Sequence, residues 1–173
     1  MKLSIREIAI FSMLGALMVA SKLAMDLLPN IHLIGVFICA ITVVYRKKAL
    51  YPIYVFVFLE GLLNGFGLWW IPYLYIWTLL WLAVMIIPKR VSAKARPLVL
   101  MVLCSVHGFL YGTLYAPAQA LLFGLNFRQT VAWIIAGLPY DCIHGISNLV
   151  CGTLILPIAK AICLADKQST ISL

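Results

Sequence analysis

Long apolar runs separated by short polar gaps make up most of this chain. A helix that crosses a bilayer needs about 20 mostly apolar residues, and six runs approach or exceed that length. The predicted spans cover residues 5–28, 31–45, 50–66, 68–87, 97–125 and 128–164. The second is short, and the last two are long enough to tilt or kink, with Pro117, Pro139 and Pro157 as expected kink points. The pattern predicts an all-α integral membrane protein, a six-helix bundle forming one domain over residues 1–173.

The composition supports a lipid environment. Apolar residues make up 65% of the 173 residues and charged residues 10%, and the mean hydropathy is +1.08. A soluble chain of this length has too much surface for its volume to bury so many apolar side chains. These figures exclude most soluble enzymes and a disordered chain.

The net charge of +8 is distributed unevenly over the predicted topology. One face of the membrane carries eleven basic residues against two, Lys22 and Arg128, toward the other. The eleven are Lys2, Arg6, Arg46, Lys47, Lys48, Lys89, Arg90, Lys94, Arg96, Lys160 and Lys167. Basic residues concentrate in cytoplasmic loops, so both termini are expected in the cytoplasm. Glu7 and the lack of a small-residue cleavage site favour a retained first helix over a signal peptide.

Several chemistries lack their sequence signals. The five cysteines lie in or at the end of apolar runs without CxxC spacing, so we expect buried thiols rather than disulfides or a zinc site. No Walker loop, GxSxG or HExxH motif is present, and no basic stripe of the kind that binds nucleic acid. We therefore expect neither an enzyme nor a metal or cofactor site in this chain.

Charged side chains within spans are expensive, so each marks a candidate site. Lys22 and Asp26 are one helical turn apart, and either pair with each other or join Asn30 and His32 in a polar cluster at the outer mouth. A second group lies near the outer end of the third span. It comprises Glu60 and Asn64, which act in helix capping and packing or in ligand binding.

An aromatic segment follows the turn at residues 64–67. Trp69, Trp70 and Tyr73 either form an interfacial aromatic belt or a stacking wall for a planar ligand. Together with the connection that contains Asn30 and His32, the connection at residues 65–70 is expected to act as a lid.

The last two spans carry polar stripes at helical spacing. The fifth span has His107, Tyr111, Tyr115 and Gln119, and the sixth has Asp141, His144 and Asn148. Such stripes either hydrogen-bond to a neighbouring helix or line a cavity. We expect a polar-lined pocket in the outer half of the bundle, and its excess of carboxylates favours a neutral or cationic ligand. The candidate binding residues are Asn30, His32, Glu60, Asn64, Trp69, Trp70, Tyr73, His107, Tyr111, Tyr115, Gln119, Asp141, His144 and Asn148.

Ala16, Ala20 and Ala24 recur every four residues in the first span and make a face that another helix can approach closely. The alternative is packing within the bundle. In this stripe, in its length and in its predicted topology, the chain resembles the substrate-binding S components of energy-coupling factor (ECF) vitamin transporters. Residues 29–35 and 69–73 are also similar to segments of S-component-like membrane proteins.

The resemblance implies a prokaryotic plasma-membrane subunit that captures a small water-soluble vitamin or related micronutrient from outside. It also implies partners: a transmembrane coupling subunit, which would dock on Ala16, Ala20 and Ala24, and two cytoplasmic ATPases that hydrolyse ATP. One alternative is a self-contained proton-coupled transporter that uses Glu60 or Asp141 as a relay. A membrane enzyme or assembly protein is the other.

Overall fold

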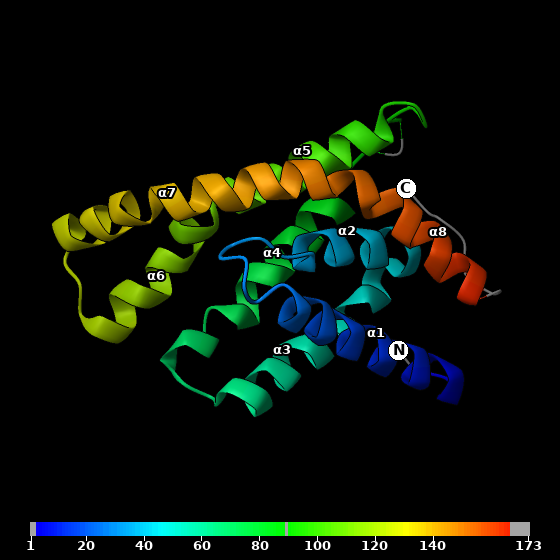
Figure 1. Cartoon of the computed structure of the whole chain (residues 1–173), viewed down its shortest axis with the longest axis horizontal. Helices are drawn as coiled ribbons and strands as arrows, with labels where there is room; N and C mark the ends of the chain where they lie inside the picture. The colour runs from blue at the N-terminus through cyan, green and yellow to red at the C-terminus, as the bar shows by residue number, and fades with distance from the viewer. Residues whose placement is uncertain (1–2, 89, 167–173) are drawn as a thin grey trace.

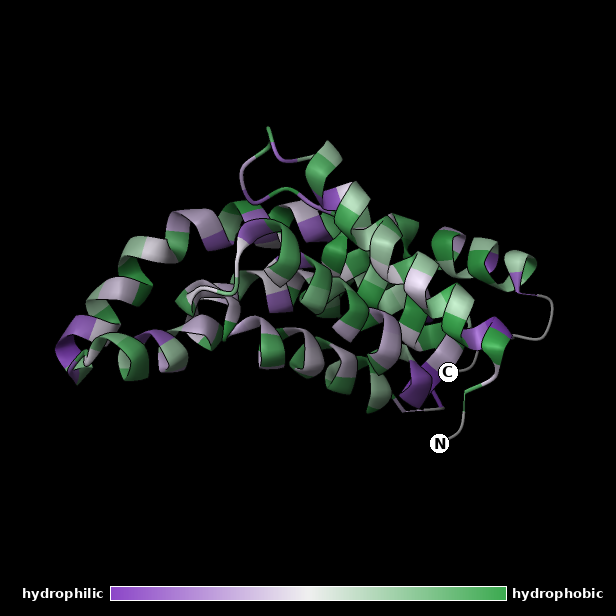
Figure 2. Cartoon of the chain, turned by 90° about the horizontal axis from the view of Figure 1, so that it is seen from below, coloured by the Kyte–Doolittle hydropathy of each residue, from purple (hydrophilic) through white to green (hydrophobic). Residues whose placement is uncertain are grey.

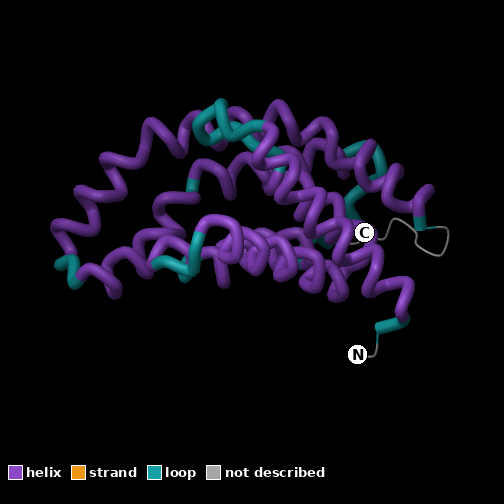
Figure 3. Tube along the Cα trace, turned by 60° about the horizontal axis from the view of Figure 1, so that its bottom comes forward, coloured by secondary structure: helices purple, strands orange, loops and turns teal. Residues whose placement is uncertain are grey.

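A computed structural model describes residues 3–88 and 90–166. Within these residues all regular structure is helical, as expected (Figure 3). The helices are α1 (Ile5–Ala24), α2 (Ile34–Tyr45), α3 (Leu50–Asn64), α4 (Tyr73–Met85), α5 (Arg96–Phe109), α6 (Tyr111–Phe123), α7 (Phe127–Cys151) and α8 (Ile155–Ala165). Three short 3-10 helices join them: η1 (Arg46–Ala49), η2 (Leu68–Trp70) and η3 (Gly152–Leu154).

The helices group into six stretches that follow the predicted order, but they differ in length. Four stretches are long and apolar enough to cross a membrane, namely Ile5–Ala24, Leu68–Met85, Arg96–Phe123 and Phe127–Ala165. The 12 residues of α2 and the 15 of α3 fall short of the roughly 20 needed to span. The second stretch begins at Ile34, since residues 31–33 belong to the preceding connection.

The predicted kink points are not where the helices are interrupted. The α6 and α7 helices continue through Pro117 and Pro139, and Pro157 lies in the first turn of α8. The interruptions fall at Leu110, between α5 and α6, and at η3, between α7 and α8. Proline is tolerated early in a helix because the first N–H groups have no partner in the helix anyway, which explains the place of Pro157.

The α2 helix is the centre of the core. Every residue of it except Tyr45 is buried, and it packs on α4 and α8 with further contacts to α5, α1 and α7. A helix that is apolar all round is either surrounded by other helices or faces lipid, and the contacts of α2 show that it is surrounded. Its short length therefore fits a core helix rather than a lipid-facing span.

Two helix pairs flank this core (Figure 1). On one side α1 lies along α3, with Gly15 so close to Val55 that a Cβ atom at Gly15 would lie 2.5 Å from that side chain. On the other side α7 lies along α5, and the first half of α7 forms a projecting arm with α6. Hydrophobic residues run along most of the helices (Figure 2), and many large apolar side chains are exposed, as expected for helices that face lipid.

Ion pairs tie both ends of the described chain together. The guanidinium of Arg6 lies 2.9 Å from the carboxylate of Asp166, and the Tyr45 hydroxyl donates to the same carboxylate at 3.1 Å. Lys48 pairs with Glu7. The start of α1 and the end of α8 thus lie at one end of the molecule, near η1. Of the eleven predicted basic residues on that face, Lys2, Lys89 and Lys167 lie outside the described residues.

Candidate ligand cavity

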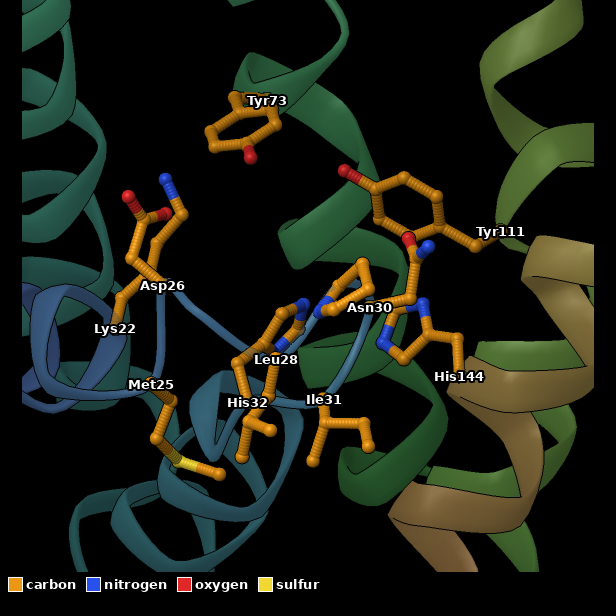
Figure 4. Close-up of a pocket in the computed structure, with 11 residues that line it drawn as sticks. Lys22, Met25, Asp26, Leu28, Asn30, Ile31, His32, Tyr73, Tyr111 and His144 are labelled. Atoms are coloured by element: carbon orange, nitrogen blue, oxygen red, sulfur yellow. The ribbon is translucent and has the colours of Figure 1, made fainter.

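A cavity of about 250 Å³ lies at the opposite end of α1 from these ion pairs, under the connection between α1 and α2 (Figure 4). Its volume equals that of about eight liquid water molecules. Charged, aromatic and aliphatic side chains line it. They are Lys22, Met25, Asp26, Leu28, Pro29, Asn30, Ile31, His32, Tyr73, Tyr111 and His144.

Four helices and one connecting segment contribute polar groups to this cavity. The last turn of α1 supplies Lys22, and the connection that follows supplies Asn30, whose φ of 60° is a left-handed conformation that asparagine tolerates. Tyr73 is the first residue of α4, and Tyr111 is the first of α6, just after the interruption at Leu110. His144 reaches the cavity from the middle of α7 (Figure 4).

Aromatic rings form one wall. The His32 and His144 rings have centroids 4.7 Å apart, and the Tyr111 ring lies 5.0 Å from His144. Trp77, which is buried, supports them, with its ring 5.5 Å from Tyr73 and 5.7 Å from Tyr111. Ring contacts at these separations are favourable, and such a wall suits stacking against a planar ligand.

Two imidazole nitrogens in this wall have no hydrogen-bond partner among the described residues, Nδ1 of His32 and Nε2 of His144. The side chain of His144 is only 3% exposed. Burial, assisted by the Lys22 ammonium, lowers the pKa of His32 to about 4, so this ring is neutral at pH 7. A buried polar atom without a partner costs roughly 1–3 kcal/mol. Both rings are therefore available to hydrogen-bond a bound molecule.

A buried ion pair borders the cavity. The Lys22 ammonium pairs with Glu60 of α3 rather than with Asp26. Of the two interpretations of Lys22 and Asp26, the structure therefore favours the outer polar cluster with Asn30 and His32. Glu60 is fully buried and does not line the cavity. Because Lys22 is neutralised in this way, the exposed carboxylate of Asp26 remains at the rim. The amide of Asn64 lies 3.5 Å from Glu60, at the limit of a hydrogen bond.

A second polar cluster, here called the α7 seam, lies where α7 packs on α5 and on the first turn of α6. It consists of Ser105, Gly108, Gly112, Asp141, Gly145 and Asn148. Both carboxylate oxygens of Asp141 accept from the Gly112 N–H, at 3.0 and 3.1 Å. In an unbroken helix that N–H would donate to the carbonyl of Gly108. Asp141 thus satisfies a donor that the interruption at Leu110 leaves free.

Other side chains of the α7 seam also bond across helices, although Oδ1 of Asn148 has no partner among the described residues. The Asn148 amide donates to the Cys104 carbonyl at 3.2 Å, and the Ser105 hydroxyl donates to the Gly145 carbonyl at 2.8 Å. Nearby, His107 shares a hydrogen bond with the carbonyl of Ile76 at 3.1 Å. These side chains connect helices, which was the alternative interpretation of the two polar stripes.

The predicted aromatic segment is likewise held by backbone contacts. The indole of Trp70 donates to the Val57 carbonyl at 2.7 Å. The Tyr115 hydroxyl donates to the carbonyl of Trp69 at 3.0 Å. Gln119 lies farther along α6, on the projecting arm. None of these four side chains lines the cavity.

Five of the predicted binding residues therefore come together. They are Asn30, His32, Tyr73, Tyr111 and His144. The structure puts nine outside this cavity: Glu60, Asn64, Trp69, Trp70, His107, Tyr115, Gln119, Asp141 and Asn148. Lys22 and Asp26 also line the cavity, but they were not among the predicted binding residues. The sequence placed them only in the outer polar cluster, because two charges one helical turn apart stood within a predicted span.

The small-residue face of α1 points away from the bundle. Ala16, Ala20 and Ala24 are all exposed, whereas the packed face of α1 is formed by other residues, among them Gly15 and Met18. The alternative interpretation, packing of these alanines inside the bundle, is therefore not supported.

Comparisons with models of protein families, with curated proteins and with solved structures found no match.

Proposed function

We propose that this chain is a substrate-capture subunit of the ECF S-component type. It would bind a small water-soluble organic molecule, a vitamin or related micronutrient, and deliver it inward with a coupling subunit and two ATPases. The observation that carries the proposal is the cavity near the end of α1, where a connecting segment covers rings from α4, α6 and α7. The four helical stretches long enough to cross a membrane agree with a membrane location.

The lining of the cavity suggests the chemistry of the ligand. Tyr73, Tyr111 and the imidazole of His144 offer ring faces and hydrogen-bonding atoms to a planar, polar heterocycle. The one charge at the rim that has no ion-pair partner among the described residues is that of Asp26. The volume of about 250 Å³ is at the small end for ligand sites. A compact, neutral or cationic ring compound fits these features best.

The first experiment is a binding screen on the purified chain in detergent. Thermal shifts against a panel of vitamins, nucleobase derivatives and amino acids would be followed by calorimetry of each compound that raises the melting temperature. We expect one compound to bind tightly without any partner protein. A well-folded chain that binds nothing in a broad panel, and that does not co-purify with an ATPase module, would contradict the proposal.

The exposed alanine face supports a docking role for α1. Ala20→Trp is expected to abolish uptake in cells that contain the whole transporter, while ligand binding and the melting temperature stay unchanged, because the side chain of Ala20 is exposed. Gly15→Trp is the matched control on the opposite face, where Val55 leaves no room, and it should lower the melting temperature. Normal uptake by the Ala20→Trp variant would contradict docking on this face.

The alternative, a self-contained proton-coupled transporter, has one feature in its favour. Glu60 is a fully buried carboxylate with one oxygen unpaired among the described residues and the other on Lys22, as a proton relay requires. Purified chain reconstituted alone in vesicles distinguishes the two proposals. Uptake driven by a pH gradient, and lost in Glu60→Gln, would support the relay; no uptake without ATPase partners supports the capture subunit.

A further inference from the structure

A groove of about 690 Å³ runs along the outer face of α3. It lies apart from the ligand cavity and shares no lining residue with it. One lysine and six apolar or aromatic side chains line it. They are Lys47, Leu50, Tyr51, Tyr54, Val55, Phe58 and Leu59.

Neighbouring helices hold the walls of the groove in place. The ring of Tyr51 stacks on Phe11 of α1, with centroids 6.0 Å apart and an interplanar angle of 5°. The Tyr54 hydroxyl donates to the Leu74 carbonyl at 2.8 Å and also contacts the hydroxyl of Thr78 in α4, at 2.9 Å. Because these contacts fix both rings, the groove exists before anything enters it, which lowers the entropy cost of binding.

The groove has the length of one bilayer leaflet. At 1.5 Å per residue, the helical segment from Leu50 to Leu59 is about 14 Å long. The hydrocarbon core of a bilayer is about 30 Å thick, so the apolar part of the groove matches about half of it. Tyr51, Tyr54 and Phe58 on this face are exposed, and α3 lies along α1, a helix long enough to cross a membrane, so lipid contact with this face is expected.

The polar end of the groove carries a positive charge that is not paired with any described residue. Lys47 is exposed, and its ammonium has no ion-pair or hydrogen-bond partner within residues 3–88 and 90–166. Its neighbours differ: Arg46 donates to the Met85 carbonyl at 3.0 Å, and Lys48 pairs with Glu7. Lys47 belongs to η1, at the same end of the molecule as these ion pairs, where headgroups of the leaflet would be.

We propose that this groove binds one acyl chain of an anionic phospholipid, with the lipid phosphate on Lys47. The apolar walls accept the chain over the depth of one leaflet, and the charge at the end selects an anionic headgroup. Charge complementarity and leaflet length together favour a lipid over a helix of a partner protein, which would need no cation at this position.

The test measures lipids retained by the full chain. Protein extracted from vesicles of equal parts phosphatidylglycerol and phosphatidylcholine is examined by native mass spectrometry. We expect the wild type to retain phosphatidylglycerol preferentially, and Lys47→Gln to lower that preference about fivefold, the effect of roughly one basic residue near a membrane surface. Lys94→Gln is the matched control, because Lys94 is also exposed but does not line the groove, and it should change nothing.

A second variant tests the apolar part. Leu59→Trp fills the groove near its apolar end and should reduce retention of both lipids, while glycerol 3-phosphate, a headgroup without a chain, should displace neither. The proposal is overturned if the wild type retains the two lipids equally, if Lys94→Gln acts as strongly as Lys47→Gln, or if glycerol 3-phosphate displaces the lipid. A polypeptide retained on this face in place of lipid would also overturn it. Lys47→Gln alters only an exposed side chain, so it tests the lipid-binding proposal even if Leu59→Trp does not fold.

Discussion

The ligand cavity and the α7 seam contain the same kinds of side chain but satisfy them differently. In the α7 seam the Asp141 carboxylate, the Asn148 N–H and the Ser105 hydroxyl bond to backbone atoms of a facing helix, and of these side chains only Asn148 keeps an unpartnered atom, Oδ1, among the described residues. In the cavity the His32 and His144 rings each keep a buried nitrogen without a partner among the described residues. The seam also has almost no free space, since a Cβ atom on Gly108 would lie 2.9 Å from the backbone of Gly145.

This difference separates a structural polar cluster from a candidate binding site. Polar groups that are satisfied inside the protein contribute to stability and have nothing left to offer a ligand. Unsatisfied groups beside a cavity cost stability until a ligand or water pairs with them. Substitutions in the seam should therefore lower the stability of the protein, and substitutions in the cavity should lower binding.

The largest effect is expected for Asp141→Ala. The change leaves the buried N–H of Gly112 without an acceptor, and loss of a hydrogen bond to a charged group costs up to about 3 kcal/mol. Thermal unfolding in detergent should show a clear fall in melting temperature. Asp141→Asn, which keeps one acceptor oxygen, should recover most of it. An unchanged melting temperature with lost ligand binding would instead assign Asp141 to the binding site.

The second-largest loss of stability is expected where α5 and α7 pack closely in the α7 seam. Gly108→Ala puts a methyl group 2.9 Å from the backbone of Gly145, so α5 and α7 must move apart, and overpacking of this kind costs about 2 kcal/mol. Gly137→Ala is the control on the same α7 helix, where a Cβ atom meets nothing within 4 Å. It should stabilise the helix by up to about 1 kcal/mol. Equal melting temperatures for the two variants would contradict the tight crossing.

Apolar run lengths predicted the helical class and the order of the six stretches well. They could not show that α2 is a core helix, because a buried helix and a lipid-facing helix have the same apolar composition. The sequence also predicted the helix interruptions at the wrong positions, at prolines rather than at Leu110 and η3. Proline is the strongest local signal for a break, but the interruption at Leu110 depends on Asp141 of another helix accepting the free Gly112 N–H.

The candidate site was predictable only in part. Helical spacing correctly grouped His107 with Tyr111 on one stripe, and Asp141 with His144 on another, but within each stripe one residue lines the cavity and the other does not. Which helix faces which side chain is decided by tertiary packing, and periodicity contains no information on it. The Lys22–Glu60 pair joins residues 38 positions apart, beyond the reach of any local pattern.

His144→Phe should separate binding from stability. The ring and its contacts with Tyr111 are kept, but the unpartnered buried Nε2 is removed. We expect ligand affinity to fall about tenfold, which equals about 1.4 kcal/mol, while the melting temperature stays the same or rises. His107→Phe is the matched control: it also removes a buried nitrogen without a partner, Nδ1, but it lies outside the cavity and breaks a bond to the Ile76 carbonyl. It should lower the melting temperature with little effect on affinity. If His107→Phe lowered affinity and His144→Phe lowered the melting temperature instead, the binding site would lie at His107.

The smallest effect is expected for Asp26→Asn, and it reports the charge of the ligand. Asp26 is exposed at the rim of the cavity, so solvent and salt screen its carboxylate, and surface substitutions of this kind leave stability within about 0.5 kcal/mol. A cationic ligand should bind about threefold more weakly, and the loss should shrink as ionic strength rises. A neutral ligand should bind unchanged. A gain in affinity would contradict the proposed selectivity, because it would mean that the Lys22 side of the cavity attracts an anion and that Glu60 does not neutralise it.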